Sequence, residues 1–216
     1  MGRRQIYTNP SARSWSSPWD ATTPHAQPFH QTLPGYTPSE LFSLDELAVE
    51  LGVKRIRIKA ETGRLGLPSF KVLGASYAIA RHFGVNSLSD LIDAVSGRSI
   101  TLYAATEGNH GRAVARVASL MGSSVKAKIF VRNSMDEHVR ELISSEPSTE
   151  VVLVDGGYDD AVHLSAKEAT EQVGSTEERI LVMDTSWQGY EDVPQVTAFH
   201  SHFKYPALIH VLKSIL

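Results

Sequence analysis

The sequence predicts an α/β protein with a parallel β-sheet and helices on both of its faces. One observation is that short apolar segments typical of strands alternate regularly with segments whose apolar residues have helical spacing. A second is that glycines such as Gly84, Gly97 and Gly122 directly follow the helical segments. A third is size, since 216 residues, 42% of them hydrophobic, can bury a substantial core. Alternating strands and helices are typical of βαβ units, whose ligands bind at the carboxyl ends of the strands.

The N-terminal part is expected to be irregular. Residues 5–38 are rich in Pro, Ser, Thr and His without a sustained apolar period, so we assign residues 1–35 to an extended or disordered arm. Ser43 with Glu46 forms a capping box and predicts a helix directly after it. A strand is expected over residues 53–60, where apolar and basic residues alternate.

The alternating elements follow in order along the rest of the chain. The spacing predicts helices at 72–83, 88–95, 112–121, 134–145 and 158–173, and strands at 101–106, 126–132, 151–155 and 180–184. Ser134 and Glu137 form a second capping box, which marks the start of the fourth of these helices.

Composition and charge exclude several classes of protein. A net charge of −3 does not suggest a nucleic-acid partner, and a chain without cysteine has no thiolate nucleophile or thiolate metal site. The scattered histidines predict no metal centre. The sequence contains no run of about 18 apolar residues and no apolar signal segment, so we expect a cytoplasmic protein without a membrane partner. The basic, Ser- and Thr-rich start leaves a mitochondrial transit peptide as the alternative.

The segment TEGNHG at residues 106–111 lies between a predicted strand and a predicted helix. Backbone N–H groups and the Asn109 amide would there face the crevice at the edge of the sheet, which is a ligand-binding position. The alternative is a plain glycine turn with an exposed polar side chain. A dinucleotide-binding Rossmann protein is the least favoured interpretation, because no G-x-G-x-x-G sequence follows any of the strands.

Three segments in a fixed order carry a resemblance to a known family. They are PSFKVLGA at residues 68–75, ATEGNHG at 105–111 and DTSWQGY at 184–190. Together they resemble the fold-type II pyridoxal-phosphate enzymes, the tryptophan synthase β-like group, and within it the diaminopropionate ammonia-lyases. The likeness covers residues 36–194. It implies a pyridoxal-phosphate-dependent domain over those residues, with a small domain at about 74–180 and a divergent tail at 195–216.

The resemblance also implies an activity and a set of site residues. The family's reaction is an α,β-elimination from 2,3-diaminopropionate that gives pyruvate and ammonia. Lys71 would hold pyridoxal 5'-phosphate through a Schiff base, and Glu107 and Asp184 would be the catalytic acid–base groups. Asn109 would bind the 3'-oxygen of the cofactor ring, with Gly108, His110 and Gly111 beside it. The family's more usual residue at position 107 is Asp, so Glu107 moves the carboxylate by about 1.5 Å.

Each of these residues also has a simpler interpretation. A lysine at a helix start is most often a surface lysine, Glu107 can be a solvated turn carboxylate, and Asp184 can be a capping residue. The resemblance ends at about residue 194, and the glycine-rich loop that holds the cofactor phosphate in this family has no counterpart here. The expected function is an ammonia-lyase that acts on a small amino acid, with an activity that is impaired or incomplete in this chain. Intact members of the family are expected to be homodimers. The alternative is a non-catalytic remnant or interaction module of the same fold.

Overall fold

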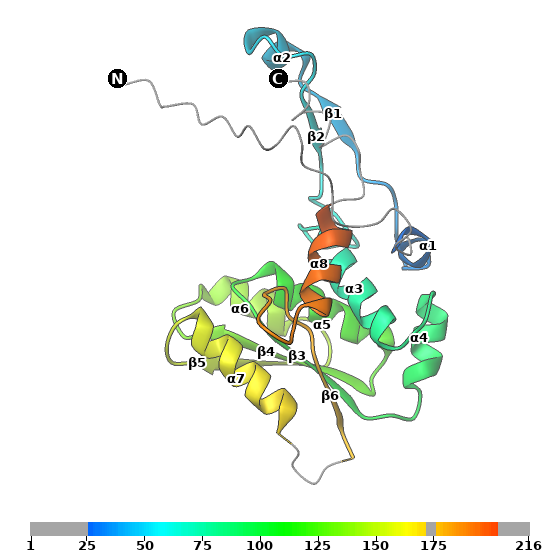
Figure 1. The fold of residues 1–216 in the computed structure, drawn as a ribbon, viewed down its shortest axis with the longest axis vertical. Coiled ribbons are helices and arrows are strands. Elements are labelled where there is room, and N and C mark those ends of the chain that lie inside the picture. Colours follow the sequence, from blue (N-terminus) through cyan, green and yellow to red (C-terminus); the bar gives the residue numbers. More distant parts are fainter. Residues whose placement is uncertain (1–25, 172–175, 203–216) are drawn as a thin grey trace.

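The computed structural model describes residues 26–171 and 176–202, and its centre is a four-stranded parallel sheet (Figure 1). The strands lie in the order β5-β4-β3-β6. Their bounds are Ile100–Ala105 for β3, Val125–Arg132 for β4, Thr149–Val154 for β5 and Glu178–Leu181 for β6. Every residue of β3 is buried, as expected for a strand that has a neighbour on each side and helices above and below.

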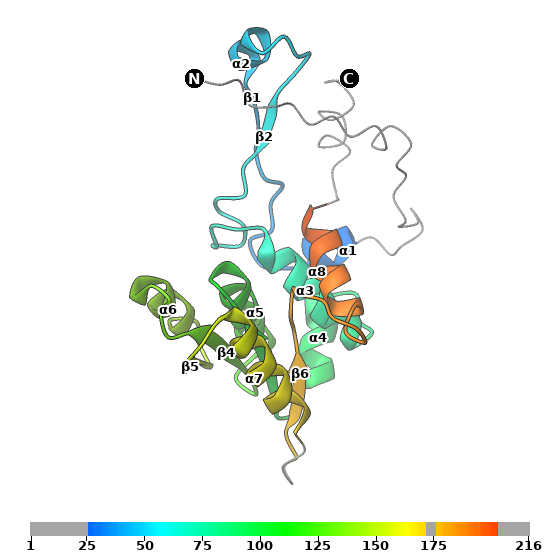
Figure 2. The same cartoon turned by 60° about the vertical axis from the view of Figure 1, so that its left-hand side comes forward.

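Helices cover both faces of this sheet. The helices α5 (Asn109–Met121) and α6 (Glu137–Ser144) lie on one face, and α7 (Tyr158–Thr170) lies on the other (Figures 1 and 2). This arrangement follows from right-handed crossovers, because the chain moves outward from β3 to β5 and then returns past β3 to β6. The predicted parallel α/β fold is confirmed.

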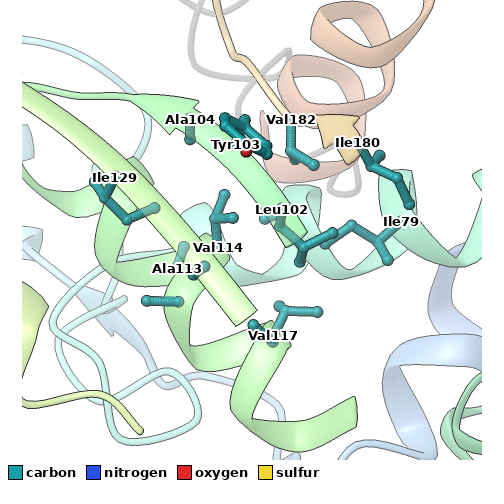
Figure 3. Packing of buried hydrophobic residues seen from close by; sticks show 14 of the residues in the cluster. Ile79, Leu102, Tyr103, Ala104, Ala113, Val114, Val117, Ile129, Ile180 and Val182 are labelled. Carbon is teal, nitrogen blue, oxygen red and sulfur yellow. The ribbon is translucent and has the colours of Figure 1, made fainter. Parts of the chain in front are cut away.

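The hydrophobic core lies between the sheet and its helices. Figure 3 shows Leu102 of β3, Val114 of α5 and Ile79, which lies in the helix at residues 71–82, gathered in it. Helix α3 spans Lys71–His82 and α4 spans Leu88–Val95, close to the predicted bounds. Burial of these apolar side chains is the main favourable contribution to folding.

Two further helices, which were not predicted, contain buried residues. Helix α1 (Ala26–Gln31) contains the buried Phe29, so the expectation of an extended arm is wrong for these residues, while residues 1–25 lie outside the described part. Helix α8 (Asp192–His202) packs along α3 and crosses the point where the family resemblance ends. Residues 203–216 of the expected tail lie outside the described residues.

A projecting arm, residues 40–60, extends away from the sheet (Figures 1 and 2). Its strands β1 (Leu41–Ser43) and β2 (Arg57–Lys59) pair antiparallel, and α2 (Asp45–Glu50) connects them. Large apolar side chains are exposed along it, namely Leu41, Phe42, Leu47, Val49, Leu51 and Ile58. The predicted capping box is wrong here, because Ser43 ends β1 and Leu44 stands at the N-cap without a side-chain hydrogen bond.

The second predicted capping box is also replaced by another contact. The side chain of Asp136, not Ser134, accepts a hydrogen bond from the Val139 N–H at the start of α6. An aspartate in this position also places negative charge at the positive end of the helix. Among residues 26–171 and 176–202, none of the helices has the length and apolar character needed to span a membrane.

Candidate active site

The candidate site lies where the strand order reverses. From β3 the chain continues to β4 on one side, whereas β6 pairs with β3 on the other side. The loops that leave β3 and β6 therefore diverge at the carboxyl edge of the sheet, which is where open α/β sheets bind ligands. The first of these loops carries the segment 106–108, and the second carries Asp184.

Lys71 and Asp184 meet at this edge, although 113 residues separate them in the sequence. Lys71 is the first residue of α3, and its Nζ donates a hydrogen bond of 2.7 Å to Oδ2 of Asp184. Both side chains are largely enclosed, with 31% of Lys71 and 20% of Asp184 exposed. Burial opposes the charged form of Asp184, but the electrostatic attraction of His110, together with the hydrogen bond and positive charge of Lys71, outweighs it and holds the pKa of the carboxyl below its ordinary value. An amine and a carboxylate suited to proton exchange are thus in direct contact.

His110 joins this pair from the first turn of α5. Its Nε2–H donates to the carbonyl oxygen of Val182 at 2.8 Å, and its Nδ1 lies 3.8 Å from Oδ2 of Asp184. Only 4% of the side chain is exposed. Burial lowers the pKa of His110 despite the neighbouring carboxylate, so the imidazole is neutral near pH 7. A carbonyl only accepts, so the proton of the neutral ring is on Nε2.

The turn before α5 is held by one hydroxyl group. Thr106 Oγ1 accepts hydrogen bonds from the N–H groups of Gly108 at 2.9 Å and Gly111 at 3.0 Å. A Cβ at Gly111 would overlap the Thr106 side chain and lie 2.6 Å from Cγ2 of Ile129, so only glycine lets the helix approach the sheet this closely. Asn109 begins the helix and is exposed at the mouth of the turn.

Glu107 makes a different ion pair from the one at Lys71. Both of its oxygens accept from the guanidinium of Arg132, at 2.7 and 2.6 Å, and both side chains are partly exposed. The parallel register explains this pair, because Ala105 stands beside Phe130 and the next outward residues are therefore neighbours. Of the expected catalytic carboxylates, only Asp184 contacts Lys71.

Two tyrosines near the site were not assigned a role from the sequence. The Tyr158 hydroxyl, at the start of α7, lies 2.9 Å from Thr185 Oγ1, and burial raises its pKa. Tyr190 donates to the Leu181 carbonyl at 2.8 Å and accepts from the Met183 N–H at 3.0 Å. Both hydroxyls therefore fasten the loop that carries Asp184. The sequence could have marked Tyr158 as a residue near the site, because it directly follows a strand and two glycines.

Comparison with known proteins places this arrangement in context. Residues 32–195 match the family model described as Pyridoxal-phosphate dependent enzyme. The diaminopropionate ammonia-lyase of Escherichia coli strain K12 is 36% identical over 177 residues, which are 78% of this chain and 42% of that relative. The apo crystal structure of the Escherichia coli diaminopropionate ammonia-lyase has a TM-score of 0.72 at 31% identity, covering 88% of this chain and 52% of that one. The structure of that enzyme with D-serine has a TM-score of 0.73 at 31% identity, covering 88% and 48%.

Proposed function

Because the chain belongs to the family of pyridoxal-phosphate dependent enzymes, we propose that it carries the lysine and an acid–base group of a carbon–nitrogen lyase. The proposed reaction is α,β-elimination from 2,3-diaminopropionate, with pyruvate and ammonia as products. One observation carries the proposal: Nζ of Lys71 lies 2.7 Å from Oδ2 of Asp184 at the point where the strand order reverses. This chain spans about 42% of the length of the curated relative, so the activity is proposed for the protein as a whole.

The residues at the site fit pyridoxal phosphate. Lys71 supplies a primary amine for the cofactor aldehyde, and the exposed Asn109 supplies an amide at the mouth of α5. Gly108 and Gly111 leave the turn without side chains, and the first turn of the 13-residue helix has no acidic residue, which suits an anionic group. When bound, the cofactor would supply an electron sink for negative charge at the substrate Cα.

Asp184 is the proposed proton acceptor in this elimination reaction. The Lys71 amine must lose a proton before it can act as a nucleophile, and the nearest described carboxylate is Asp184. The same carboxylate is proposed to take the Cα proton of the substrate. Glu107 remains proposed as a second acid–base group. Its pair with Arg132 would have to open first.

The similarity to amino-acid lyases supports a small amino acid as the substrate. The solved relative binds D-serine, which has the same three-carbon skeleton as 2,3-diaminopropionate. Assembly into a homodimer is part of the same proposal.

A second candidate function is a non-catalytic interaction module of the same fold. The projecting arm favours it, because its apolar side chains, such as Phe42 at 49% and Val49 at 83% exposure, offer contact area to another surface. The two candidates differ in whether Lys71 reacts with the cofactor.

Covalent trapping distinguishes them. The 216-residue chain is incubated with pyridoxal phosphate, reduced with borohydride and mapped by peptide mass spectrometry. We expect the label on Lys71 and its complete loss in Lys71→Ala. The matched control is Lys128→Ala, which removes another partly buried lysine that is paired at 2.6 Å to Glu168. It should keep the label on Lys71.

The same samples are then assayed for pyruvate release from 2,3-diaminopropionate. Labelling of Lys71 with pyruvate release supports the lyase. No label on Lys71 and no pyruvate release favours the interaction module. Equal labelling of several lysines, unchanged in Lys71→Ala, contradicts the proposed role of Lys71.

A further inference from the structure

A turn with an unusual backbone conformation leads into helix α3. It spans residues 64–67, and the N–H of Leu67 donates to the carbonyl of Arg64 at 2.9 Å. Both central residues have a positive φ, 52° at Leu65 and 76° at Gly66, as in a type I′ turn. Glycine adopts this conformation freely, but in leucine the Cβ crowds the backbone. We call residues 64–67 the strained turn, and such strain persists only where surrounding contacts impose it.

One arginine connects the strained turn to two helices of the sheet region. Nη1 of Arg116, on α5, donates to the carbonyl of Leu65 at 2.7 Å. Its Nε and Nη2 donate to the two oxygens of Glu146, which lies just after α6, at 2.6 and 2.7 Å. The Glu146 side chain is only 4% exposed, and this two-bond contact fixes the plane of the guanidinium. Gly66 leaves room for the arginine, since a Cβ there would lie 3.2 Å from Nη1.

Other contacts fix the ends of the strained turn. The buried Arg64 donates to both oxygens of Glu61, at 2.8 and 2.9 Å, and Leu67 is buried in the hydrophobic core. The contact of Arg116 therefore acts at the middle of the turn, on the residue whose conformation is unfavourable. Without this contact Leu65 can relax toward negative φ, and the chain that follows it then changes direction.

Lys71 is the residue of α3 that depends most on the preceding loop. Residues 72–80 of this helix are all buried, so packing holds them in place. Lys71 lies at the helix end, where Phe70 at the N-cap makes no side-chain capping hydrogen bond. The N–H of Lys71 instead donates to Oγ of Ser69, in the loop, at 3.2 Å. Because the first N–H groups of a helix have no partner within it, the position of this first turn follows that of the loop.

We propose that Arg116 is a positioning residue: by holding the carbonyl of Leu65, it fixes the loop that leads into Lys71. The Lys71 amine is thereby kept within hydrogen-bond distance of Asp184. Helix α5 thus acts at both members of this pair, through Arg116 on the loop before the lysine and through His110 beside the carboxylate. This inference rests on the proposed function, because it concerns the same amine and carboxylate.

The test is a carbon-13 NMR titration of the Asp184 carboxyl in the cofactor-free chain, assigned by the resonance that Asp184→Asn removes. Burial raises the pKa of this carboxyl, and His110 and then Lys71 lower it. Displacement of the lysine amine should therefore raise the pKa. In Arg116→Leu we expect a rise of about 0.5–1 pH unit.

The matched control is Arg112→Leu. Arg112 lies one turn earlier on α5, and its Nε is 3.5 Å from Oε1 of the same Glu146. Within the described residues it makes no hydrogen bond to the strained turn. The control therefore removes a positive charge and an ion pair from the same helix but leaves the Leu65 carbonyl bound. It should change the pKa of Asp184 by less than half as much as Arg116→Leu does.

A rescue variant tests whether the effect passes through the strained turn. Leu65→Asn gives the turn the Asn-Gly sequence that type I′ turns favour, so the turn needs less support from Arg116. Combined with Arg116→Leu, it should reverse at least half of the rise in the pKa of Asp184. A general loss of packing would not be repaired in this way, because Leu65→Asn itself removes apolar contact with the core.

Three results overturn the proposal. They are an unchanged pKa of Asp184 in Arg116→Leu, an equal change in Arg112→Leu, and no recovery on addition of Leu65→Asn. If Arg116→Leu does not fold, Arg116→Leu/Glu146→Leu takes its place, since it removes the buried carboxylate together with its partner. The same rise and the same rescue are expected in that background.

The titration uses no cofactor or substrate, so its outcome is separate from that of the trapping experiment. If Lys71 is labelled and the titration of Asp184 does not respond to Arg116→Leu, the role of Arg116 fails and the proposed function stands. If the titration responds as expected and Lys71 is not labelled, the proposed function fails and the role of Arg116 in holding the pair stands.

Discussion

The parallel sheet and the projecting arm are both built from strands, but they hold their apolar residues in opposite ways. All six residues of β3 are buried, whereas in β1 Leu41 and Phe42 are each 49% exposed. The sheet has covering layers on both faces, while a two-stranded ribbon without such cover is only marginally stable in water. The site lies on the sheet, where packing fixes the backbone of each contributing loop. In this chain, therefore, a segment can form a strand without being packed on both faces.

The largest difference between the two regions should come from truncating matched isoleucines. Ile129 in β4 is fully buried, and Ile58 in β2 is 49% exposed. We expect Ile129→Ala to lower the free energy of unfolding by about 2–5 kcal/mol, since it leaves a cavity, and Ile58→Ala to lower it by less than about 1 kcal/mol. Urea denaturation followed by circular dichroism measures both. Equal losses would mean that the arm is as tightly packed as the sheet.

A smaller difference is expected from adding one methyl group to a glycine in each region. Gly111→Ala should cost about 1–3 kcal/mol, because the new Cβ overlaps Thr106 and presses on Ile129. Gly52, in the arm, has a positive φ of 66° and no atom near its missing Cβ, so Gly52→Ala should cost only about 1 kcal/mol of backbone strain. The midpoint of thermal unfolding reports both. A harmless Gly111→Ala would show that the helix and sheet can separate at this point.

The smallest effect is a pH dependence of stability that belongs to the sheet region. The pKa of His110 is lowered from 6.5 by burial, so the unfolded chain binds more protons than the folded chain below that pH. Stability is therefore complete above about pH 6.5 and decreases as the pH falls toward the lowered pKa, by at most about 1.4 kcal/mol for each pH unit. Asp184, whose pKa is lowered from 3.8, adds a similar loss at more acidic pH.

Urea unfolding at several values between about pH 8 and pH 5 measures this dependence. His110→Leu should flatten the curve in that range, whereas Asp184→Asn should extend the loss to lower pH, because it removes the carboxylate that raises the pKa of His110. A wild-type curve that stays flat down to pH 5 would contradict the burial of a neutral imidazole.

Most of the sheet and its helices followed from the sequence, and the exceptions have two physical causes. The missed helices α1 and α8 carry Pro28 and Pro194 in their first turns, where the absent N–H costs nothing. The composition around them looked irregular for that reason. The two capping boxes were wrong because the pattern does not say which polar residue has the required backbone conformation. At α6, the neighbouring Asp136 has it instead of Ser134.

The site was predictable only in part. Lys71, His110 and Asp184 were named from the resemblance, and their mutual contact rests on the strand order, which a single sequence does not state. The Glu107–Arg132 pair depends on the register of two parallel strands. A pair across two strands has no local signature, so nothing in the sequence indicated Arg132 as the partner of Glu107.

The separation of 113 residues between Lys71 and Asp184 has a consequence for how the protein is made. Among the described residues, β6 is the last strand of the sheet in chain order, and Asp184 follows it. This strand must insert beside β3 before the two side chains can meet. Contacts this distant in sequence form slowly, and during synthesis Lys71 leaves the ribosome well before its partner exists. Until β6 docks, the amine has no counter-ion from Asp184, and a reactive aldehyde would meet it in a site that is still open to water. Docking of β6 is therefore also the event that brings Lys71 and Asp184 together.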